Sequence, residues 1–417
     1  MNSPSPPVDA LGSEPAFNPF APGYFANPYR QYEVLRDSQP AYLEDRSNAY
    51  LVTRYADVHR LARDRSMLVE ANQATPTPRI MGEIARNAKV DLGPDKWLVF
   101  RDGDDHARLR RLLTQAFTPN VVAEWRERTE GIVDELLTAA AEHDPFDAIT
   151  QFARPLPAQI ISEMLGVPDS DIPQLLDWSH ALFRTVEALN TPEEDEAILT
   201  ATRAMVAYFE GLLTEKRARA GDDILTALMA AGDSDDRLST DEILAQVVML
   251  YMGGHETTES LIGNGLVHLF ANPDEQARLV GDPNLDAAAI DELLRYDAPI
   301  QFTRRFAVNA FELHGTQIPP GADVLLGLGA ANRDPRKWGD DADRLNLSRP
   351  DARDHMSFSG GTHHCLGASL ARLEGQIALP GLLRRFPRVA PAYDEPAWAS
   401  RMVARGVDHL PVHLRGA

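Results

Sequence analysis

The stretch SFSGGTHHCLG, residues 357–367, contains the only cysteine among the 417 residues of this chain. Three glycines and two histidines surround the thiol. A helical pattern begins at Leu366 and continues to Arg385, so Cys365 is expected at a helix N-terminus, where unpaired N–H groups and the helix dipole favour a thiolate. The glycines would let the backbone approach a flat or bulky group closely. An inert core cysteine would need neither feature, and we therefore interpret this loop as a functional site.

Three roles are open to this cysteine: a buried inert thiol, a nucleophile or a metal ligand. A cysteine hydrolase needs a base within hydrogen-bond reach, and the adjacent His364 is poorly placed to be that base. Zinc usually needs three or four Cys, His or acidic ligands, and the sequence has no second cluster with ligand spacing. Haem iron fits better, because it takes a single axial thiolate from the protein, and that thiolate favours O–O cleavage.

The composition limits the possible partners. Lys and Arg total 41 and Asp and Glu total 62, which gives a net charge of −21 and disfavours nucleic-acid binding. One cysteine cannot form an intramolecular disulfide, so we expect a reducing, cytoplasmic setting. Residues 1–26 have no basic or apolar segment typical of a signal peptide, and they predict a flexible, proline-rich lead-in. The most apolar internal run, residues 243–254, is interrupted by Gln246 and is shorter than the ~20 residues that span a bilayer, so no membrane association is expected.

Helical periodicity dominates the chain and predicts a mainly α protein with small β-sheets. Residues 67–105 form a long irregular stretch and are a candidate substrate lid. No linker divides the chain, so residues 27–417 are predicted to form a single domain. The helices are expected at 29–36, 56–63, 106–116, 121–141 and 153–165, and the strands at 50–53, 306–313, 324–328 and 408–414.

A long helix is predicted from Ser239 to about Phe270, because Ser239 and Glu242 form a capping-box pattern and Asn272-Pro273 ends it. The hexapeptide GGHETT, residues 253–258, interrupts its apolar middle with glycines, a carboxylate and hydroxyls. The glycines could serve only close packing, with Glu256 solvated. Alternatively, a buried acid beside a hydroxyl could carry protons to a bound oxygen species. A kink at this hexapeptide would open a polar groove.

Pairs of charged residues recur at helical spacing elsewhere. Glu292 and Arg295 are one turn apart, and alone they predict a modest surface ion pair. His106 and Arg110 share one helix face and could reach the same anion, although a solvated basic face is the simpler interpretation. Further along, Arg304-Arg305 precede a strand and residues 332–335, NRDP, form a turn signal.

Taken together, these motifs resemble those of the soluble bacterial cytochromes P-450, which are haem-thiolate monooxygenases. Phe358 precedes Cys365 by seven positions and Gly367 follows it by two, as in the family's haem-binding loop. Residues 253–258 resemble its oxygen-activation motif, Glu292 and Arg295 its Glu-x-x-Arg helix, and residues 332–335 a turn common in its bacterial members. The resemblance extends from about Asn27 to the C-terminus. It departs from the family at Ser359, where glycine is frequent, and at His363, where arginine is common.

The resemblance implies a fold, a cofactor and roles for individual residues. The fold would be a triangular helical body with a long central helix crossing over haem b. Cys365 would be the axial iron ligand, and Glu256 and Thr257 would relay protons during dioxygen activation. Glu292 and Arg295 would lock the proximal side as a buried ion pair. The residues that the resemblance places around the haem are His106, Arg110, Arg305, Phe358, Gly361, His363, Cys365 and Gly367, of which His106, Arg110, Arg305 and His363 would bind the propionates.

A monooxygenase of this type needs two electrons from outside. The resemblance implies a ferredoxin and its flavoprotein reductase as donors, with dioxygen as co-substrate and a monomeric enzyme. Arg108, Arg111 and Arg372 would form a basic docking patch on the cysteine side. The retained acid–alcohol pair favours dioxygen over direct use of peroxide, and it disfavours a non-catalytic haem- or ligand-binding protein.

The substrate would be a lipophilic molecule, with a macrolide, steroid, terpene, fatty acid or xenobiotic all left open. Methionines at such positions are often ordinary core residues. The expected substrate contacts are Leu98, Phe100, Met249, Met252, Gly253, Ile300, Gln301, Phe302, Val403 and the neighbouring Ala404.

Overall fold

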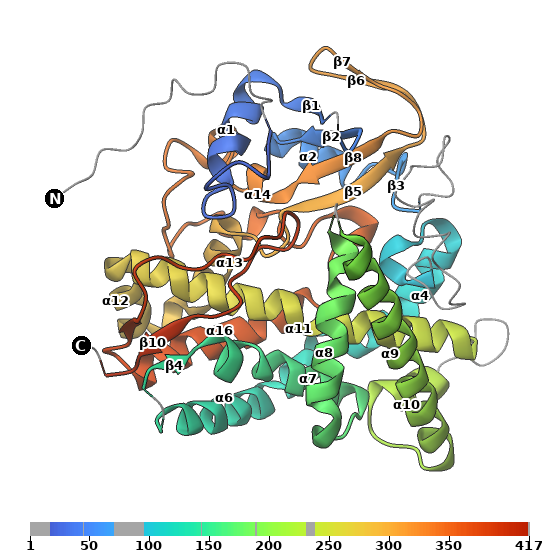
Figure 1. Cartoon of the computed structure of the whole chain (residues 1–417), viewed down its shortest axis with the longest axis vertical. Coiled ribbons are helices and arrows are strands. Elements are labelled where there is room, and N and C mark those ends of the chain that lie inside the picture. Colours follow the sequence, from blue (N-terminus) through green and yellow to red (C-terminus); the bar gives the residue numbers. More distant parts are fainter. Residues whose placement is uncertain are drawn as a thin grey trace.

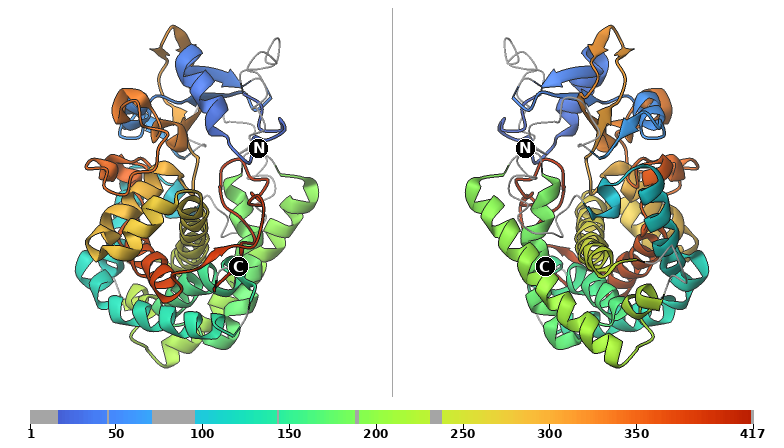
Figure 2. Two further views of the ribbon diagram at one scale, coloured as in Figure 1. Left: turned by 90° about the vertical axis from the view of Figure 1, so that its left-hand side faces the viewer. Right: turned by 90° about the vertical axis from the view of Figure 1, so that its right-hand side faces the viewer.

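The computed structural model describes residues 17–44, 46–70, 96–142, 144–187, 190–230 and 238–415 (Figure 1). Helices form most of the molecule, as the periodicity predicts, and small sheets lie beside them. Figure 2 shows the helical body and the mixed sheet region at its upper end. Among the described residues no helix is long and apolar enough to cross a membrane. The helices are α1 Tyr29–Ser38, α2 Tyr55–Leu61, α4 Gly103–Thr114, α5 Pro119–Glu124, α6 Arg126–Ala140, α7 Pro155–Leu165, α8 Ile172–Phe183, α9 Pro192–Ala218, α10 Ile224–Ala230, α11 Thr240–Ala271, α12 Pro273–Gly281, α13 Asp286–Tyr296, α14 Leu328–Ala331, α15 Pro335–Trp338 and α16 Ala368–Arg385.

The largest sheet has the order β1-β2-β8-β5-β3, in which β2 and β8 are parallel and the other pairs antiparallel. It is formed by β1 Ala41–Glu44, β2 Ala49–Val52, β3 Met67–Leu68, β5 Phe302–Ala307 and β8 Asp323–Gly327. A three-stranded sheet contains β4 Phe146–Asp147, β9 Ala390–Pro391 and β10 Pro411–His413, and a hairpin contains β6 Phe311–Leu313 and β7 Thr316–Ile318.

Several predicted boundaries change in the structure. The strand expected over 306–313 is wrong as one element, because β5 ends at Ala307 and β6 pairs only with β7. The helix expected over 121–141 is two helices that meet at Trp125. The ordered chain begins earlier than Asn27, since Phe17 and Tyr24 are buried against the large sheet and α1. The proposed lid lies largely outside the described residues.

The long helix α11 crosses the molecule beneath the sheet region (Figure 1). Its capping box forms as predicted: the Ser239 hydroxyl accepts from the Glu242 N–H, and the Glu242 carboxylate accepts from the Ser239 N–H. The helix runs unbroken through the glycine pair. A Cβ on Gly254 would lie 2.9 Å from Ile161 Cγ1 of α7, so this glycine is needed where two helices approach closely. The close-packing interpretation of the pair therefore holds at Gly254.

The pair Glu292–Arg295 is fully buried on α13 rather than a surface ion pair. Arg295 Nε lies 2.6 Å from Glu292 Oε2, and the guanidinium also donates to the carbonyls of Asn332, Ala342 and Arg344. Asn332 continues the network: its Nδ2 donates to Ser357 Oγ at 2.8 Å. The ion pair therefore anchors the segment that leads into the cysteine loop.

Candidate functional site

The cysteine loop lies between the short helix η12 (Gly361–His363) and α16. The Cys365 N–H donates to the Phe358 carbonyl at 2.9 Å, which closes the loop. Gly361 has a φ of +68°, and a Cβ there would lie 2.7 Å from the Ala62 carbonyl oxygen. Only glycine tolerates this backbone and this approach. Gly361, which the family resemblance places around the haem, therefore does not line the cavity. It allows the loop to pack closely against Ala62 on the side away from the cavity.

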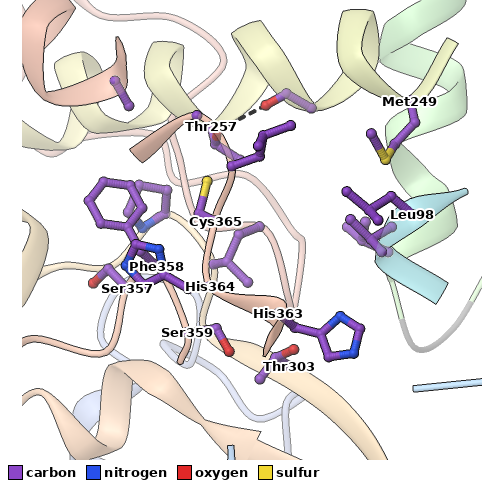
Figure 3. A pocket seen from close by; sticks show the side chains of 18 of the residues that line it. Leu98, Met249, Thr257, Thr303, Ser357, Phe358, Ser359, His363, His364 and Cys365 are labelled. Carbon is purple, nitrogen blue, oxygen red and sulfur yellow. Dashed lines mark hydrogen bonds between the residues drawn. The ribbon is translucent and has the colours of Figure 1, made fainter. Parts of the chain in front are cut away.

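The Cys365 thiol opens into a cavity of about 410 Å³. Thr257 of α11 faces it from the opposite side (Figure 3). The thiol is accessible from the cavity although protein surrounds it on the other sides. This burial raises the pKa of Cys365, against the opposing effects of the Gly367 N–H and the nearby Arg110 and Arg372. A metal cation would reverse that balance, because a coordinating thiol is deprotonated.

Two arginines, the buried Arg305 and the half-buried Arg110, lie on one side of the cavity. Arg305 is 2% exposed and donates to Thr303, Ser359 and the Arg304 carbonyl, and no carboxylate in the described part of the chain pairs with it. Burial lowers the pKa of Arg305 to about 10. Arg110 also lines the cavity, and burial lowers its pKa as well. Such groups need an anion from outside the chain.

Two histidines lie beside these arginines. His106 Nε2 is buried without a hydrogen-bond partner, and desolvation, helped by His363 and Arg110, lowers the pKa of His106 to about 4, so its ring is a neutral hydrogen-bonding group near neutral pH. The two histidine rings are 4.4 Å apart. His363 Nε2 lies 3.1 Å from Asp102 Oδ1, a partner that no sequence pattern indicates. The residues therefore fit a group with a metal centre and two peripheral carboxylates, as haem has.

Phe358 packs beside the loop, and the Arg372 guanidinium lies 4.6 Å from its ring centroid. Arg372 Nε also donates to Asp291 at 2.7 Å, and Arg108 pairs with Glu242 at the start of α11. Arg108 and Arg372 of the predicted docking patch are therefore already in ion pairs. Arg111, the third member, is exposed on α4 and also interacts within the chain.

The proposed acid–alcohol pair does not lie together in the cavity. Thr257 lines it and donates to the Gly253 carbonyl at 3.4 Å. Glu256 is 4% exposed and lies away from the cavity lining. Its Oε1 is 2.8 Å from His180 Nδ1 of α8 and 3.6 Å from His255 Nε2, although no well-aligned hydrogen bond forms. Successive residues on a helix are ~100° apart, so neighbours in sequence face different surroundings. Glu256 must change its side-chain rotamer to reach Thr257.

The imidazole of His180 is expected to titrate abnormally high. Its contact with Glu256 raises the pKa of His180, and the two histidines outweigh burial and lower the pKa of Glu256. The pair therefore stabilises the fold at pH values between these two pKa values. That stability is lost as pH rises through the raised pKa of His180 or falls through the lowered pKa of Glu256. Histidine NMR should show His180 titrating above the ordinary value of about 6.5.

In the variant Glu256→Gln the His180 resonance should titrate closer to that ordinary value. His59, whose ring stacks on Tyr55 far from this pair, is an internal control in the same spectra. An unchanged His180 titration in Glu256→Gln would contradict the contact.

Most of the expected substrate contacts line the cavity: Leu98, Phe100, Met249, Met252, Gly253, Ile300, Phe302 and Val403. Gln301 and Ala404 do not. The Gln301 amide turns into the core, where Nε2 donates to the Ala298 carbonyl at 2.7 Å and to the Tyr29 hydroxyl at 3.2 Å. The cavity wall also includes Phe183 at the end of α8 and Thr185 and Val186 just after it, none of which the sequence predicts as substrate contacts. No local signal marks these residues, because the fold alone brings them to the cavity.

Two acids near the cavity were also missed. Glu187 is buried, and its carboxylate accepts from the N–H groups of Met402, Val403 and Ala404, which joins the end of α8 to the C-terminal wall. Glu374 of α16 lines the cavity, its Oε2 has no partner among the described residues, and burial raises its pKa well above the ordinary range.

The sequence matches the family model for cytochrome P-450 over residues 82–282 and 284–398. It is 36% identical over 403 residues to 6-deoxyerythronolide B hydroxylase of Saccharopolyspora erythraea, covering 93% of this chain and 96% of that protein. It is 35% identical over 402 residues to vitamin D(3) 25-hydroxylase of Pseudonocardia autotrophica, covering 95% and 96%. Among solved structures, the bacillaene polyketide synthase cytochrome PksS of Bacillus subtilis superimposes with a TM-score of 0.86 at 32% identity, covering 95% of this chain and 99% of that one.

The chain therefore belongs to the cytochrome P-450 family, and its fold is the P-450 fold. It is a haem-thiolate monooxygenase, an oxidoreductase that binds haem b and oxidises lipophilic small molecules with electrons from redox partners.

Proposed function

We propose that the Cys365 thiolate would bind the haem iron. His106, Arg110, Arg305 and His363 would hold the two propionates. The observation that supports this most strongly is the placement of one accessible thiol opposite Thr257, in a cavity that also holds the buried Arg305, which has no carboxylate partner among the described residues. Phe358 packs beside the thiolate, and Gly361 and Gly367 allow the loop its shape.

The residues of the chain bind and orient the substrate and deliver protons to the cavity. Bound haem supplies dioxygen activation and transfer of one oxygen atom to the substrate. The apolar wall excludes water, so that protons enter only through polar groups. The Thr257 hydroxyl, which donates to the Gly253 carbonyl, would turn toward the cavity to donate a proton there. Glu256 is ionised beside His180, so it would take up a proton as it turns away from His180 and then pass that proton to the Thr257 hydroxyl, which makes it a gated proton donor and not a permanent partner.

The substrate is proposed to be a large lipophilic molecule. Two relatives are named as hydroxylases of 6-deoxyerythronolide B and of vitamin D(3). Another neighbour is a myxobacterial cytochrome of 32% identity and TM-score 0.87, solved in complex with myristic acid. The long apolar wall formed by α8, α11 and the C-terminal segment suits ligands of this size.

The electron donor is proposed to be a ferredoxin served by a flavoprotein reductase, and the enzyme a cytoplasmic monomer with one catalytic domain over residues 27–417. The exposed Arg111 and the partly exposed Arg108 and Arg372 would attract an acidic donor to the side of the cysteine loop. Because two of these cations are already paired, the donor must compete with Glu242 and Asp291, which favours a weak and transient encounter.

Replacing Thr257 by alanine tests the proposed proton delivery. In a reconstituted system with ferredoxin and reductase, the wild type should convert consumed NADH mainly into oxidised substrate. Thr257→Ala should release most electrons as hydrogen peroxide, and product per NADH should fall by about tenfold or more, because a lost general acid–base group costs roughly 10²–10⁴-fold.

Thr257→Ser keeps the hydroxyl and serves as the matched control, with coupling expected near the wild-type value. Full coupling in Thr257→Ala would overturn the role of this hydroxyl. If hydrogen peroxide without donors supports turnover as well as the complete system does, the alternative of a peroxide-using enzyme would be favoured. A library of lipophilic compounds can be screened for shifts of the haem absorption spectrum and for oxidation. If no compound in it is oxidised, the alternative of a non-catalytic binding protein would be favoured.

A further inference from the structure

Gln246 is a fully buried polar residue in the apolar first half of α11. Its Oε1 accepts from the Leu98 N–H at 2.9 Å, and its Nε2 donates to the Lys96 carbonyl at 2.8 Å. The side-chain amide thus pairs with a backbone segment through one donor and one acceptor, as a neighbouring β-strand would. Both bonds lie where a buried amide without partners would be costly.

The segment held in this way is the short helix η4 (Leu98–Phe100), which projects into the cavity. Trp97 is buried directly before it and stacks on Phe100, with the ring centroids 6.1 Å apart. In Figure 3 Leu98 lies near Met249, one turn beyond Gln246 on α11. Gln246, which holds η4 by hydrogen bonds, and Met249, which lines the cavity, therefore lie on the same helix and both face η4.

The other end of η4 is fixed independently. Asp102 Oδ2 accepts from the N–H groups of Val69 and Glu70 at 2.8 and 2.7 Å, and Asp102 Oδ1 lies 3.1 Å from His363. One end of the turn is therefore tied to the cysteine loop, and the other is held by Gln246 together with the packing of the buried Trp97. Loss of the glutamine amide would loosen that end alone, because the contacts of Asp102 would remain.

We propose that Gln246 is a positioning residue that fixes how far Leu98 and Phe100 project over the cavity, and thereby determines which ligand sizes the enzyme accepts. The proposal rests on the proposed haem site, because the cavity is read as the substrate pocket. Gln246 itself does not line the cavity. It acts on the ligand only through the turn.

The test compares two nitrogen ligands in the haem-loaded enzyme by optical titration. Both ligands bind haem iron through a ring nitrogen, but 4-phenylimidazole also carries a phenyl ring that must be accommodated in the cavity, so its affinity is expected to depend on the position of η4 more than that of imidazole does. In Gln246→Met, which keeps the side-chain length but removes both hydrogen bonds, 4-phenylimidazole should bind about tenfold more weakly. Imidazole should stay within about twofold of the wild type, since its contacts do not change.

Hydrogen exchange supplies a second readout that does not use a ligand. The amides of residues 97–100 should exchange faster in Gln246→Met, while those of residues 361–367 keep their wild-type rates. Gln174→Met, at an exposed glutamine of α8, is the matched control and should change neither measurement. Gln246→Leu also removes both hydrogen bonds without burying a charge, so it should behave as Gln246→Met does, and it replaces that variant if Gln246→Met does not fold.

An unchanged ratio of the two dissociation constants would overturn the proposal, whatever the exchange rates. Equal weakening of both ligands would also overturn it, because it would indicate general loss of the pocket. A wild-type enzyme whose spectrum does not respond to imidazole would instead contradict the haem site itself, so the two failures are distinguishable.

Discussion

Replacing Cys365 by serine is expected to abolish the long-wavelength Soret band of the reduced, carbon monoxide-treated protein, the band that gives the family its name. The hydroxyl of serine does not ionise at neutral pH, so no strong anionic donor would remain for the iron. Because the sequence contains one cysteine, no second thiol can take its place. Monooxygenase activity should fall below detection, and haem content measured after purification should fall with it.

Ser369→Ala, at the exposed second residue of α16, is the matched control for this variant and should keep the full band. If Cys365→Ser retained the long-wavelength band, Cys365 would not be the iron ligand. Retained hydrolytic or other activity that needs the thiol but not haem would point back to a cysteine nucleophile, the interpretation that the loop sequence alone left open.

The second large effect is expected at Glu292. Glu292→Gln should lower the free energy of unfolding by about 3 kcal/mol, since removal of one member of a buried ion pair leaves the other charge uncompensated. Glu292 also accepts from the Asn346 N–H and lies 3.4 Å from Arg349, so the loss would spread beyond Arg295. Urea unfolding of the haem-loaded protein measures the change.

The control for this prediction is Glu130→Gln, which removes an exposed pair with Arg126 and should change the unfolding free energy by less than about 1 kcal/mol. The double variant Glu292→Gln, Arg295→Met should recover part of the loss, because it removes the stranded charge as well. Equal stability of Glu292→Gln and wild type would show that the burial of this pair has no energetic consequence.

The sequence predicts correctly those features in which two side chains must be a fixed number of residues apart. Cys365 with Phe358 and Gly367 is such a case, and so is the capping box that starts α11. In both, local spacing is sufficient because a loop or a helix turn sets the distance. The predicted burial of Glu292 with Arg295 came from the family resemblance alone, since their spacing by itself favoured a surface pair.

The sequence could not predict contacts that only tertiary packing creates. His180 is 76 positions before Glu256, and nothing in the sequence around either residue indicates that they meet. Gln301 was expected to line the cavity because its neighbours Ile300 and Phe302 are apolar. Side chains alternate between the two sides of an extended segment, however, and this alternation turns the Gln301 amide into the core. Gln246 was noticed as an interruption of an apolar run, but its partners became visible only in three dimensions.

The capping box at the start of α11 has a consequence for how the sequence of this helix can change. Glu242, Gln246 and Met249 follow at one-turn intervals and reach α4, the 98–100 turn and the cavity, while Thr257 faces Cys365 further along. One residue inserted between Met249 and Thr257 would rotate the two groups against each other by ~100°. The spacing of these side chains along α11 is therefore fixed relative to its capped end. Natural sequence variation in α11 should occur by substitution rather than by insertion or deletion.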